Sequence, residues 1–374
     1  PPPFPPPPPS PPPPPAKQGC WTQFSDTLKI SAPTPVAITN DRLIYVDAEA
    51  SYNVVRTFEL DGFNWKPSTV LGNATTNLGR TLNMNARGTA MVISNKEQTA
   101  VFVYRWDEEN AWKKVAIIVD RPYGWSVRNR DLHVAGEWPS IRIGFCVCEE
   151  LPANSCKVNT YHIDIGGNVT MYTPIQGIEK AYFHQHKTDH PPVDLTFSDD
   201  GNKLFVGFYQ DGGSVETFHL NVSLATWVRT ERIHGDNIGR AVAVSSDGSV
   251  LVTTTSPMFV GDSNGVFVYS ANTTGRLELP RFGSRIDVSG DGGRIMVVER
   301  DSNSQIDVWS IRVYDTYENR SDVYNDVTFG MVLNEEQILH PDISIAISPN
   351  ASFLVVATSN TVRTFFDERC PQLR

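Results

Sequence analysis

Three observations predict an all-β protein, a seven-bladed β-propeller closed by an N-terminal strand in the last blade. A unit of two short β-rich runs around a tight turn occurs seven times between residues 35 and 358. A third run follows each pair and is rich in aromatic residues in six of the seven units. The last unit lacks a fourth run, and residues 21–30 carry the pattern of that missing run. Pairing a strand from one terminus with strands from the other is how a propeller closes its ring.

The first run of each unit alternates apolar with polar residues, which predicts a half-buried strand, and the second run is β-rich. The turns between them contain Asn or Gly, which tolerate the positive φ of tight hairpins. The paired runs are 35–39 and 43–48, 81–85 and 90–95, 131–135 and 140–145, 194–198 and 203–208, 241–245 and 250–255, 285–289 and 294–299, and 344–348 and 353–358. The predicted turns lie at 40–41, 87–88, 135–136, 200–201, 247–248, 291–292 and 350–351.

The third and fourth runs complete each predicted blade. The third runs are 54–60, 101–106, 158–164, 215–220, 266–270, 310–315 and 362–366. The fourth run often starts at a tryptophan, as it does at Trp65, Trp112 and Trp227, and Trp21 begins the run that would complete the last unit. The predicted domains are therefore a proline-rich segment over 1–19 and a propeller over 20–374.

The charge and composition of the chain exclude several classes of function. The 32 Lys and Arg against 42 Asp and Glu give a net charge of −10, and no basic stripe is present, so nucleic acid is not a predicted partner. The most apolar runs, such as 115–119 and 354–357, are far too short to cross a bilayer, so no membrane insertion is predicted.

Residues 20–370 resemble seven-bladed β-propellers of the WD40 and YVTN type through the S-x-D-G turns at Ser245–Gly248 and Ser289–Gly292. The preceding Ile238-Gly-Arg and Phe282-Gly-Ser also resemble FG-GAP-like repeats. The chain departs from these families because it has no Gly-His…Trp-Asp signature and no full D-x-D-x-D-G calcium loop.

Thirteen of the first 15 residues are Pro. Such a run cannot form helix or sheet and predicts a polyproline II rod, which could be an inert spacer. The Ser-Pro block over 10–15 resembles the hydroxyproline-rich segments of extensins and of pherophorin-type matrix proteins. That resemblance implies hydroxylation and O-glycosylation at Pro5, Pro6, Pro7, Pro8, Pro9, Pro11, Pro12, Pro13, Pro14 and Pro15.

Six N-x-Ser/Thr sequons favour secretion to the extracellular space, as a cell-wall, matrix or surface-appendage protein. They begin at Asn73, Asn168, Asn221, Asn272, Asn319 and Asn350. All except Asn73 are predicted on one rim of the propeller, in third-to-fourth or first-to-second turns, and Asn73 is predicted in an inter-blade connection on the opposite rim. The alternative is that turns are simply where Asn is common.

Five cysteines are present. Cys20 precedes the closing strand and Cys370 follows the last one, so a bridge between them would clasp the ring. Counting outward from Pro152 sets Cys148 opposite Cys156, which predicts a second bridge. Cys146 is left over, as a buried thiol or as one half of an intermolecular bridge.

The loop around His184, His186 and His190 carries three His and an Asp within seven residues, a set that could bind a transition metal. A solvated polar loop is the preferred interpretation, so neither a metal nor another cofactor is predicted. No catalytic motif is present, and the chain is predicted not to be an enzyme.

These features predict a secreted structural glycoprotein, a subunit of an extracellular matrix or surface fibre that self-associates through its rod and propeller and carries covalent N- and O-glycans. The alternative is an adhesion or lectin propeller that binds carbohydrate or protein on its less glycosylated rim.

Overall fold

The structure, a computed structural model, describes residues 21–23, 28–30, 35–48, 53–62, 64–73, 76–95, 97, 99–107, 109, 111–119, 125–127, 132–149, 156–175, 193–208, 213–235, 238–255, 265–270, 276–279, 283–301, 308–315, 327–329, 343–358 and 361–367. The predicted proline-rich segment 1–19 therefore lies outside the described residues.

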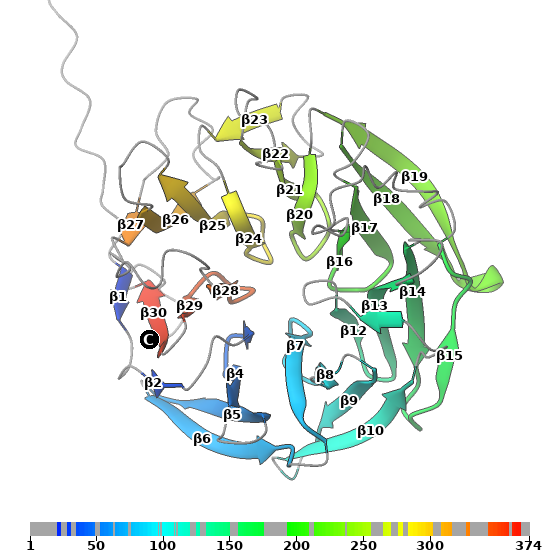
Figure 1. Cartoon of the computed structure of the whole chain (residues 1–374), viewed down its shortest axis with the longest axis horizontal. Helices are drawn as coiled ribbons and strands as arrows, with labels where there is room; N and C mark the ends of the chain where they lie inside the picture. Colours follow the sequence, from blue (N-terminus) through cyan, green and yellow to red (C-terminus); the bar gives the residue numbers. More distant parts are fainter. Residues whose placement is uncertain are drawn as a thin grey trace, which may run out of the picture.

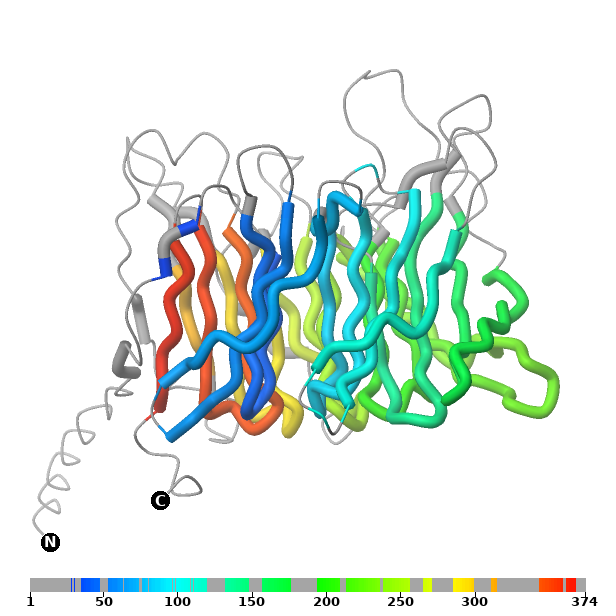
Figure 2. Tube along the Cα trace, turned by 90° about the horizontal axis from the view of Figure 1, so that it is seen from below, coloured from blue at the N-terminus to red at the C-terminus, as the bar shows by residue number. Residues whose placement is uncertain are grey.

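Seven antiparallel sheets of the described chain form a ring around a central axis (Figure 1). Seen from the side, the strands run roughly along that axis (Figure 2). This arrangement confirms the predicted all-β, seven-bladed propeller.

The strands follow one another from the centre of each blade outward. Blade 1 contains β3 (Val36–Ile38), β4 (Arg42–Ala48), β5 (Asn53–Asp61) and β6 (Asn64–Leu71), and blade 2 contains β7 (Leu78–Met84), β8 (Ala90–Asn95), β9 (Val101–Trp106) and β10 (Trp112–Ile118). Blade 3 contains β11 (Trp125–Val127), β12 (His133–Glu137), β13 (Ser140–Glu149), β14 (Cys156–Ile163) and β15 (Val169–Met171). Blade 4 contains β16 (Val193–Phe197), β17 (Lys203–Phe208), β18 (Ser214–Asn221), the short 3-10 helix η1 (Val222–Leu224) and β19 (Thr226–His234).

The last three blades follow the same order. Blade 5 contains β20 (Ile238–Val244), β21 (Val250–Thr255), β22 (Val266–Ser270) and β23 (Arg276–Leu279), and blade 6 contains β24 (Gly283–Val288), β25 (Arg294–Asp301), β26 (Val308–Asp315) and β27 (Val327–Phe329). Blade 7 contains β28 (Ser344–Ile347), β29 (Phe353–Ala357), β30 (Thr361–Asp367), β1 (Trp21–Gln23) and β2 (Leu28–Lys29). Within the described residues, no helix is long and apolar enough to span a membrane.

The N-terminal strands close the ring as predicted. β1 pairs antiparallel with β30, with Trp21 opposite Asp367, and β2 pairs with the other end of β30, with Leu28 opposite Val362. Blade 7 is therefore built from both ends of the chain, so the ring closes by main-chain hydrogen bonds.

Blade 3 differs from the prediction at its innermost position. The turn was expected at Ala135-Gly136, but β12 runs on to Glu137 and the hairpin reverses at Trp138-Pro139, which are joined by a cis peptide bond. A further strand, β11, pairs with the far end of β13. β11 lies outside the repeated pattern of paired runs, so that pattern does not predict it.

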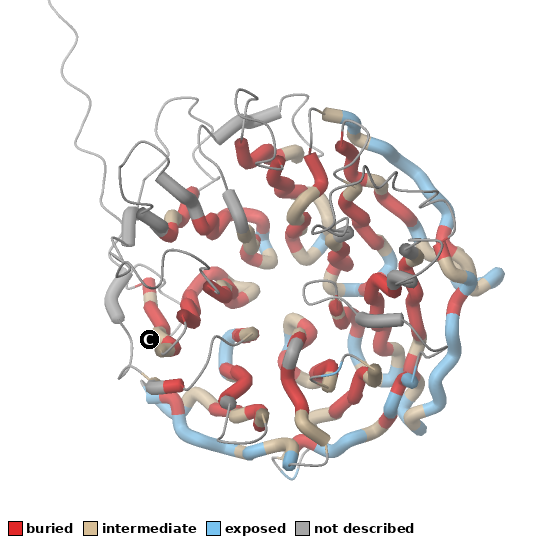
Figure 3. The backbone as a smooth tube through the Cα atoms, in the orientation of Figure 1, coloured by how far each residue is buried: buried red, intermediate tan, exposed pale blue. Residues whose placement is uncertain are grey.

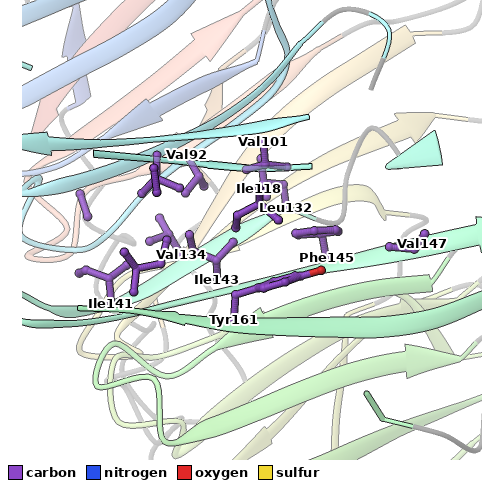
Figure 4. Close-up of a cluster of buried hydrophobic side chains, with 14 residues drawn as sticks. Val92, Val101, Ile118, Leu132, Val134, Ile141, Ile143, Phe145, Val147 and Tyr161 are labelled. Atoms are coloured by element: carbon purple, nitrogen blue, oxygen red, sulfur yellow. The ribbon is translucent and has the colours of Figure 1, made fainter. Parts of the chain in front are cut away.

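The hydrophobic core lies between the blades. One cluster combines residues of blade 2, such as Val92 and Val101, with residues of blade 3, such as Ile143 and Phe145 (Figure 4). The second strand of a blade is covered on both faces, and residues 141–147 of β13 are all buried. The outer strands are largely exposed, so burial falls from the centre of the ring to its edge (Figure 3).

In blades 1 and 4, a tryptophan fastens the exposed outer strand to the preceding blade. Trp65 Nε1 donates to Thr364 Oγ1 at 3.2 Å, and Trp227 Nε1 donates to Thr160 Oγ1 at 2.7 Å. Both indoles are buried although their strands are at the edge. Because a buried indole N–H needs an acceptor, the third strand of the preceding blade supplies a threonine hydroxyl.

The first hairpin turns of blades 4 to 7 share one hydrogen-bond network, shown here by blade 5. Ser245 Oγ donates to Asp247 Oδ1 at 2.7 Å, Ser249 N–H donates to the same oxygen at 2.8 Å, and Val250 N–H donates to Ser245 Oγ at 3.0 Å. Gly248 supplies the positive φ of 66°. Blades 4, 6 and 7 repeat these contacts, which explains the S-x-D-G pattern as turn chemistry.

These turns also join one blade to the next, and together they form what we call the turn ring, residues 39–42, 85–89, 136–140, 198–201, 245–248, 289–292 and 348–351. Four backbone bonds of 2.7–2.8 Å link neighbouring turns, from Gly136 N–H to Asp199, Asp199 to Ser246, Ser246 to Gly290 and Gly290 to Pro349. Side chains close the other three junctions, from Asn350 N–H to Asn40 Oδ1, from Arg42 Nη1 to the Gly88 carbonyl and from Asn85 Nδ2 to the Gly136 carbonyl.

Basic side chains reinforce the turn ring. The first or an early residue of the second strand reaches the next turn and donates to its carbonyl in four blades, from Arg42 to Gly88, Arg142 to Asp200, Lys203 to Asp247 and Arg294 to Ala351. Arg294 also pairs with the fully buried carboxylate of Asp367. The repeated turn is thus both a hairpin and an inter-blade joint.

Candidate functional site

A central channel of about 290 Å³ runs along the axis of the ring. The innermost strand of each of the seven blades contributes to its wall, and Asp199, Ser246, Gly290 and Pro349 of the turn ring lie at one end. Because every blade contributes, residues far apart in the sequence converge here, as is typical of ligand sites in folds of this kind.

Charge is distributed unevenly around the channel. The lining residues of blades 7, 1 and 2 are apolar or neutral, among them Ile345, Val36 and Leu82. The charged and titratable lining residues come from blades 3 to 6 and are His133, Asp194, Asp199, Arg240, Arg285 and Asp287. The wall therefore has a charged part and an uncharged part, and the uncharged part includes the polar residues Thr81, Asn83 and Ser344.

The charged residues also fall at different depths. Arg240 and Arg285 lie five and four residues before the serine of their turns, and Asp287 lies two residues before it. At about 3.3 Å per strand residue, the two arginines stand roughly 7–10 Å farther from the turn ring than Asp287 does. A small anion is the ligand class that two guanidinium groups favour.

Several polar side chains of the wall tie neighbouring blades together. Asp287 Oδ2 accepts from Ile347 N–H at 2.8 Å, and Asn83 Oδ1 accepts from Val134 N–H at 3.1 Å, at the same position of the repeat. Asp194, four residues before the serine of its turn, accepts through Oδ2 from Val242 N–H at 2.7 Å. These residues have a structural role, whether or not a ligand enters.

Burial sets the protonation of the wall. It raises the pKa of Asp287 to about 6, although Ile347 and Val288 donate backbone hydrogen bonds that favour the ionised form. Burial lowers the pKa of His133 to about 4, so this imidazole is neutral near pH 7. Burial also raises the pKa of Asp199, against the hydrogen bond that its carboxylate accepts from Ser246 Oγ.

The described residues contain no group of three His, Cys, Asp or Glu side chains placed to hold a metal ion. His184, His186 and His190 lie outside the described residues, so the expectation for that loop stays a prediction. The ten prolines predicted to be modified also lie outside them.

Four of the six sequons fall within the described residues, and each begins in a turn. Asn73 follows β6 in an inter-blade connection, Asn168 and Asn221 lie between the third and fourth strands of their blades, and Asn350 lies between β28 and β29. These positions agree with the predicted rims. Asn272 and Asn319 lie outside the described residues.

The asparagines of these sequons have local structural contacts. Asn221 Oδ1 accepts from Leu224 N–H at 3.2 Å and caps η1, and Asn73 Oδ1 accepts from Thr76 N–H at 3.0 Å. Asn350 holds the turn of blade 7 and is followed by Ala351 and Ser352, both buried. The turn role of Asn350 accounts for an asparagine at this position.

The structure describes three of the five cysteines and leaves the other two outside the described residues. Cys148 lies directly opposite Cys156 in the β13–β14 register, as the count from Pro152 predicted. Opposed Cα atoms of antiparallel strands are about 4.5–5.5 Å apart, within the range of a disulfide, so that bridge stays a prediction. Cys146 is fully buried, which disfavours the intermolecular bridge. Cys20 and Cys370 lie outside the described residues.

Sequence reasoning missed the channel. Its polar residues occur at alternate positions of the innermost runs, where they look like the ordinary polar positions of strands. The signal that was present is that the first runs 194–198 and 285–289 contain the charged residues Asp194, Arg285 and Asp287, whereas those at 35–39 and 344–348 contain none.

Comparison with solved structures confirms the propeller fold. The chain is similar to the Cps50 (Swd1) β-propeller domain of Myceliophteria thermophila, with a TM-score of 0.55 and 11% identity over 93% of this chain and 99% of that chain. It is also similar to a candidate 6-phosphogluconolactonase of Bacteroides uniformis, with a TM-score of 0.56 and 14% identity over 85% of this chain and 89% of that chain. A candidate 6-phosphogluconolactonase of Bacteroides fragilis gives a TM-score of 0.53 and 15% identity over 85% and 88%.

No family model matches the chain, and no curated protein sequence is similar to it. The likeness to solved structures, at 11–15% identity, shows the fold alone.

Proposed function

We propose that the chain is a secreted structural glycoprotein, a subunit of an extracellular matrix or surface fibre. The observation that carries this proposal is the position of the sequons, because Asn73 and Asn168 are exposed in turns and Asn221 begins an exposed 3-10 helix. Turn chemistry explains an Asn at each position, but it does not require the Ser or Thr two residues later.

The proline-rich segment supplies the assembly step of the proposal. Its sequence is typical of the polyproline ligands that dock on grooves of binding modules. A segment of one copy bound by the next copy makes a head-to-tail contact, and a head-to-tail contact that does not close gives a filament.

Electron cryo-microscopy of native material, together with a variant that lacks residues 1–15, tests this proposal. We expect fibres from the full chain and single propellers from the shortened chain, with the same unfolding temperature for both. Fibres of unchanged appearance from the shortened chain would refute the assembly step. An intracellular protein without glycans would refute the secretion step.

The channel supports a second candidate, a propeller that binds a small acid or an acidic sugar between Arg240 and Arg285. The observation that favours it is the charged part of the wall, from blades 3 to 6, facing an uncharged part from blades 7, 1 and 2. Two structures of similar fold are described as candidate 6-phosphogluconolactonases, so lactone hydrolysis is the enzymatic version of this candidate. Our first proposal includes no catalytic activity.

A glycan array probed with the full chain discriminates the second candidate. Binding of acidic glycans that is lost in Arg240→Gln and Arg285→Gln, and retained in the rim variant Arg87→Gln, supports a channel site. If the wild type and the three variants bind acidic glycans equally, the glycans are recognised elsewhere on the surface.

A further inference from the structure

An apolar patch covers the outer surface where blades 3 and 4 meet. Its five members are 40–69% exposed and are Val169, Met171, Val222, Leu224 and Val228. They belong to β15, to η1 and to β19. We call these five residues the outer patch, and Figure 3 shows this part of the edge as exposed.

The two halves of the outer patch are neighbours in space. Thr173 N–H donates to the Ala225 carbonyl at 3.3 Å, which sets the end of β15 beside the end of η1. Tyr172 and Trp227 contact edge to face, with ring centroids 6.4 Å apart. Met171 and Leu224 are each within two residues of the Thr173–Ala225 bond, so the apolar side chains of the two blades lie on adjoining surface.

Two sequons border the outer patch. Asn168 directly precedes Val169, and Asn221 directly precedes Val222. By contrast, Asn73 lies in a connection where Val70 is the single exposed large apolar residue among the described residues near it in the sequence. Exposed apolar area therefore coincides with two glycosylation signals.

Both asparagines can carry a sugar without losing the contacts that hold their turns. Asn221 caps η1 through Oδ1, which glycosylation leaves unchanged. Asn168 Nδ2 donates to Asp164 Oδ2 at 2.8 Å, and an amide nitrogen has two hydrogens, so one remains for substitution. The turn itself is fixed by Asp164 Oδ1, which accepts from Gly166 N–H and Asn168 N–H.

We propose that N-linked glycans on Asn168 and Asn221 cover the outer patch and shield its apolar side chains from water and from other copies of the chain. This inference rests on the proposed secretion of the protein. A large exposed apolar patch on a soluble protein promotes association, and a sugar anchored beside it solubilises the surface.

Attachment is a group transfer from a lipid-linked oligosaccharide diphosphate in the secretory pathway. The Nδ2–C1 bond to N-acetylglucosamine forms while the C1–O bond to the diphosphate breaks. One Nδ2 proton is lost to a base, the lipid diphosphate leaves with the electron pair, and no redox change occurs.

The test removes each glycan and leaves its asparagine in place. Thr170→Ala and Ser223→Ala abolish the sequons of Asn168 and Asn221 through exposed residues that make none of the turn contacts above. The matched control is Thr75→Ala, which abolishes the Asn73 sequon. All variants are made as full chains secreted from a eukaryotic host, and glycopeptide mass spectrometry reports occupancy at every sequon.

We expect the Thr170→Ala/Ser223→Ala double variant to bind the apolar dye ANS several-fold more strongly than the wild type and to self-associate in sedimentation velocity. Thr75→Ala should match the wild type in both measurements. Adding Val222→Ser and Leu224→Ser to the double variant should restore weak dye binding and a single sedimenting species. If the double variant is not secreted, endoglycosidase treatment of the folded wild type should produce the same gain in dye binding.

Three results would overturn the inference alone, and a fourth would overturn the proposed function with it. If Asn73 is occupied while Asn168 and Asn221 are empty, the patch is uncovered and the secreted glycoprotein proposal stands. If Asn168 and Asn221 are occupied but their loss changes neither dye binding nor association, the glycans do not shield the patch. If the wild type itself pairs through the patch, a second copy is the occupant. An absence of glycan at every sequon would refute the proposed function as well.

Discussion

The inner hairpins and the outer strands of the same blades are held in place by different means. Inner turns bond to the next blade at all seven junctions of the turn ring, mostly through backbone or buried groups. Outer strands leave one edge and much of one face exposed, and β6 and β19 are each fastened to the preceding blade by a tryptophan. Substitutions at the centre of the ring should therefore cost more stability than substitutions at its exposed edge.

The largest expected effect follows from breaking the buried ion pair that reinforces the turn ring, between Arg294 and Asp367. Asp367→Ala removes the carboxylate that pairs with Arg294 and leaves that guanidinium largely buried. We expect a loss of about 3–5 kcal/mol in the free energy of unfolding, because an uncompensated buried charge is costly. Urea denaturation measures it. The exposed pair of Arg87 and Glu137 is the control, and Glu137→Ala should cost about 0–1 kcal/mol.

The second effect concerns pH and compares two groups of the channel wall. The folded-state pKa of Asp287, about 6, lies above its ordinary value of 3.8, so ionised Asp287 costs stability, and this cost grows as the pH rises from 3.8 to 6. The folded-state pKa of His133, about 4, lies below its ordinary value of 6.5. The stability that neutral His133 provides is therefore complete above pH 6.5 and is lost as the pH falls to 4.

The contributions of Asp287 and His133 to the pH dependence of the free energy of unfolding have opposite sign and nearly cancel in the wild type. Relative to Asp287→Asn, the wild type should gain on the order of 2 kcal/mol as the pH falls from 7 to 4. Relative to His133→Gln, it should lose a similar amount over the same window. Unfolding at several pH values measures both, and parallel curves for the three proteins would contradict the assigned pKa values.

A smaller effect is expected at the edge of the ring. Trp227→Phe keeps most of the apolar contact but removes the N–H that donates to Thr160 Oγ1. We expect a loss of about 1–2 kcal/mol, because the buried hydroxyl loses its partner. Thr160→Val in the same background should cost little more, and a double-mutant cycle measures that coupling. Additive effects would show that the bond does not fasten the outer strand.

The smallest contrast compares two glycines with almost the same backbone conformation. Gly248 in the turn ring has φ of 66°, and a Cβ there would meet Phe205 at 3.0 Å and Lys203 at 3.1 Å. Gly62 in an outer turn has φ of 61° and nothing within 4 Å. Alanine should cost about 1 kcal/mol at Gly62 from backbone strain alone, and more at Gly248. Equal losses in thermal unfolding would mean that the inner turn accommodates a methyl group without cost.

Much of this fold is predictable from the sequence because each blade repeats one local rule. The alternating runs and S-x-D-G turns locate the inner hairpins, and the Trp-led run at residue 21 locates the closing strand. The β11 strand and the turn at Trp138-Pro139 depart from the repeat, so the rule missed them. The turn ring was invisible as well, since most of its bonds join backbone atoms and carry no residue signature. The channel required the three-dimensional convergence of Arg240, Arg285 and Asp287.

The closing pair β1 and β30 determines how the ring bears load. Trp21, at the start of β1, lies opposite Asp367, at the end of β30, so both chain ends leave the pair at the same place. A force that pulls the two ends apart would open this pair like a zipper, one hydrogen bond at a time, rather than shear all of its bonds together. Cys20 and Cys370 stand directly beyond that vulnerable end in the sequence, and a covalent bridge between them would move the load from hydrogen bonds to a sulfur–sulfur bond. A propeller joined into a fibre through its N-terminal segment would then transmit tension without unravelling.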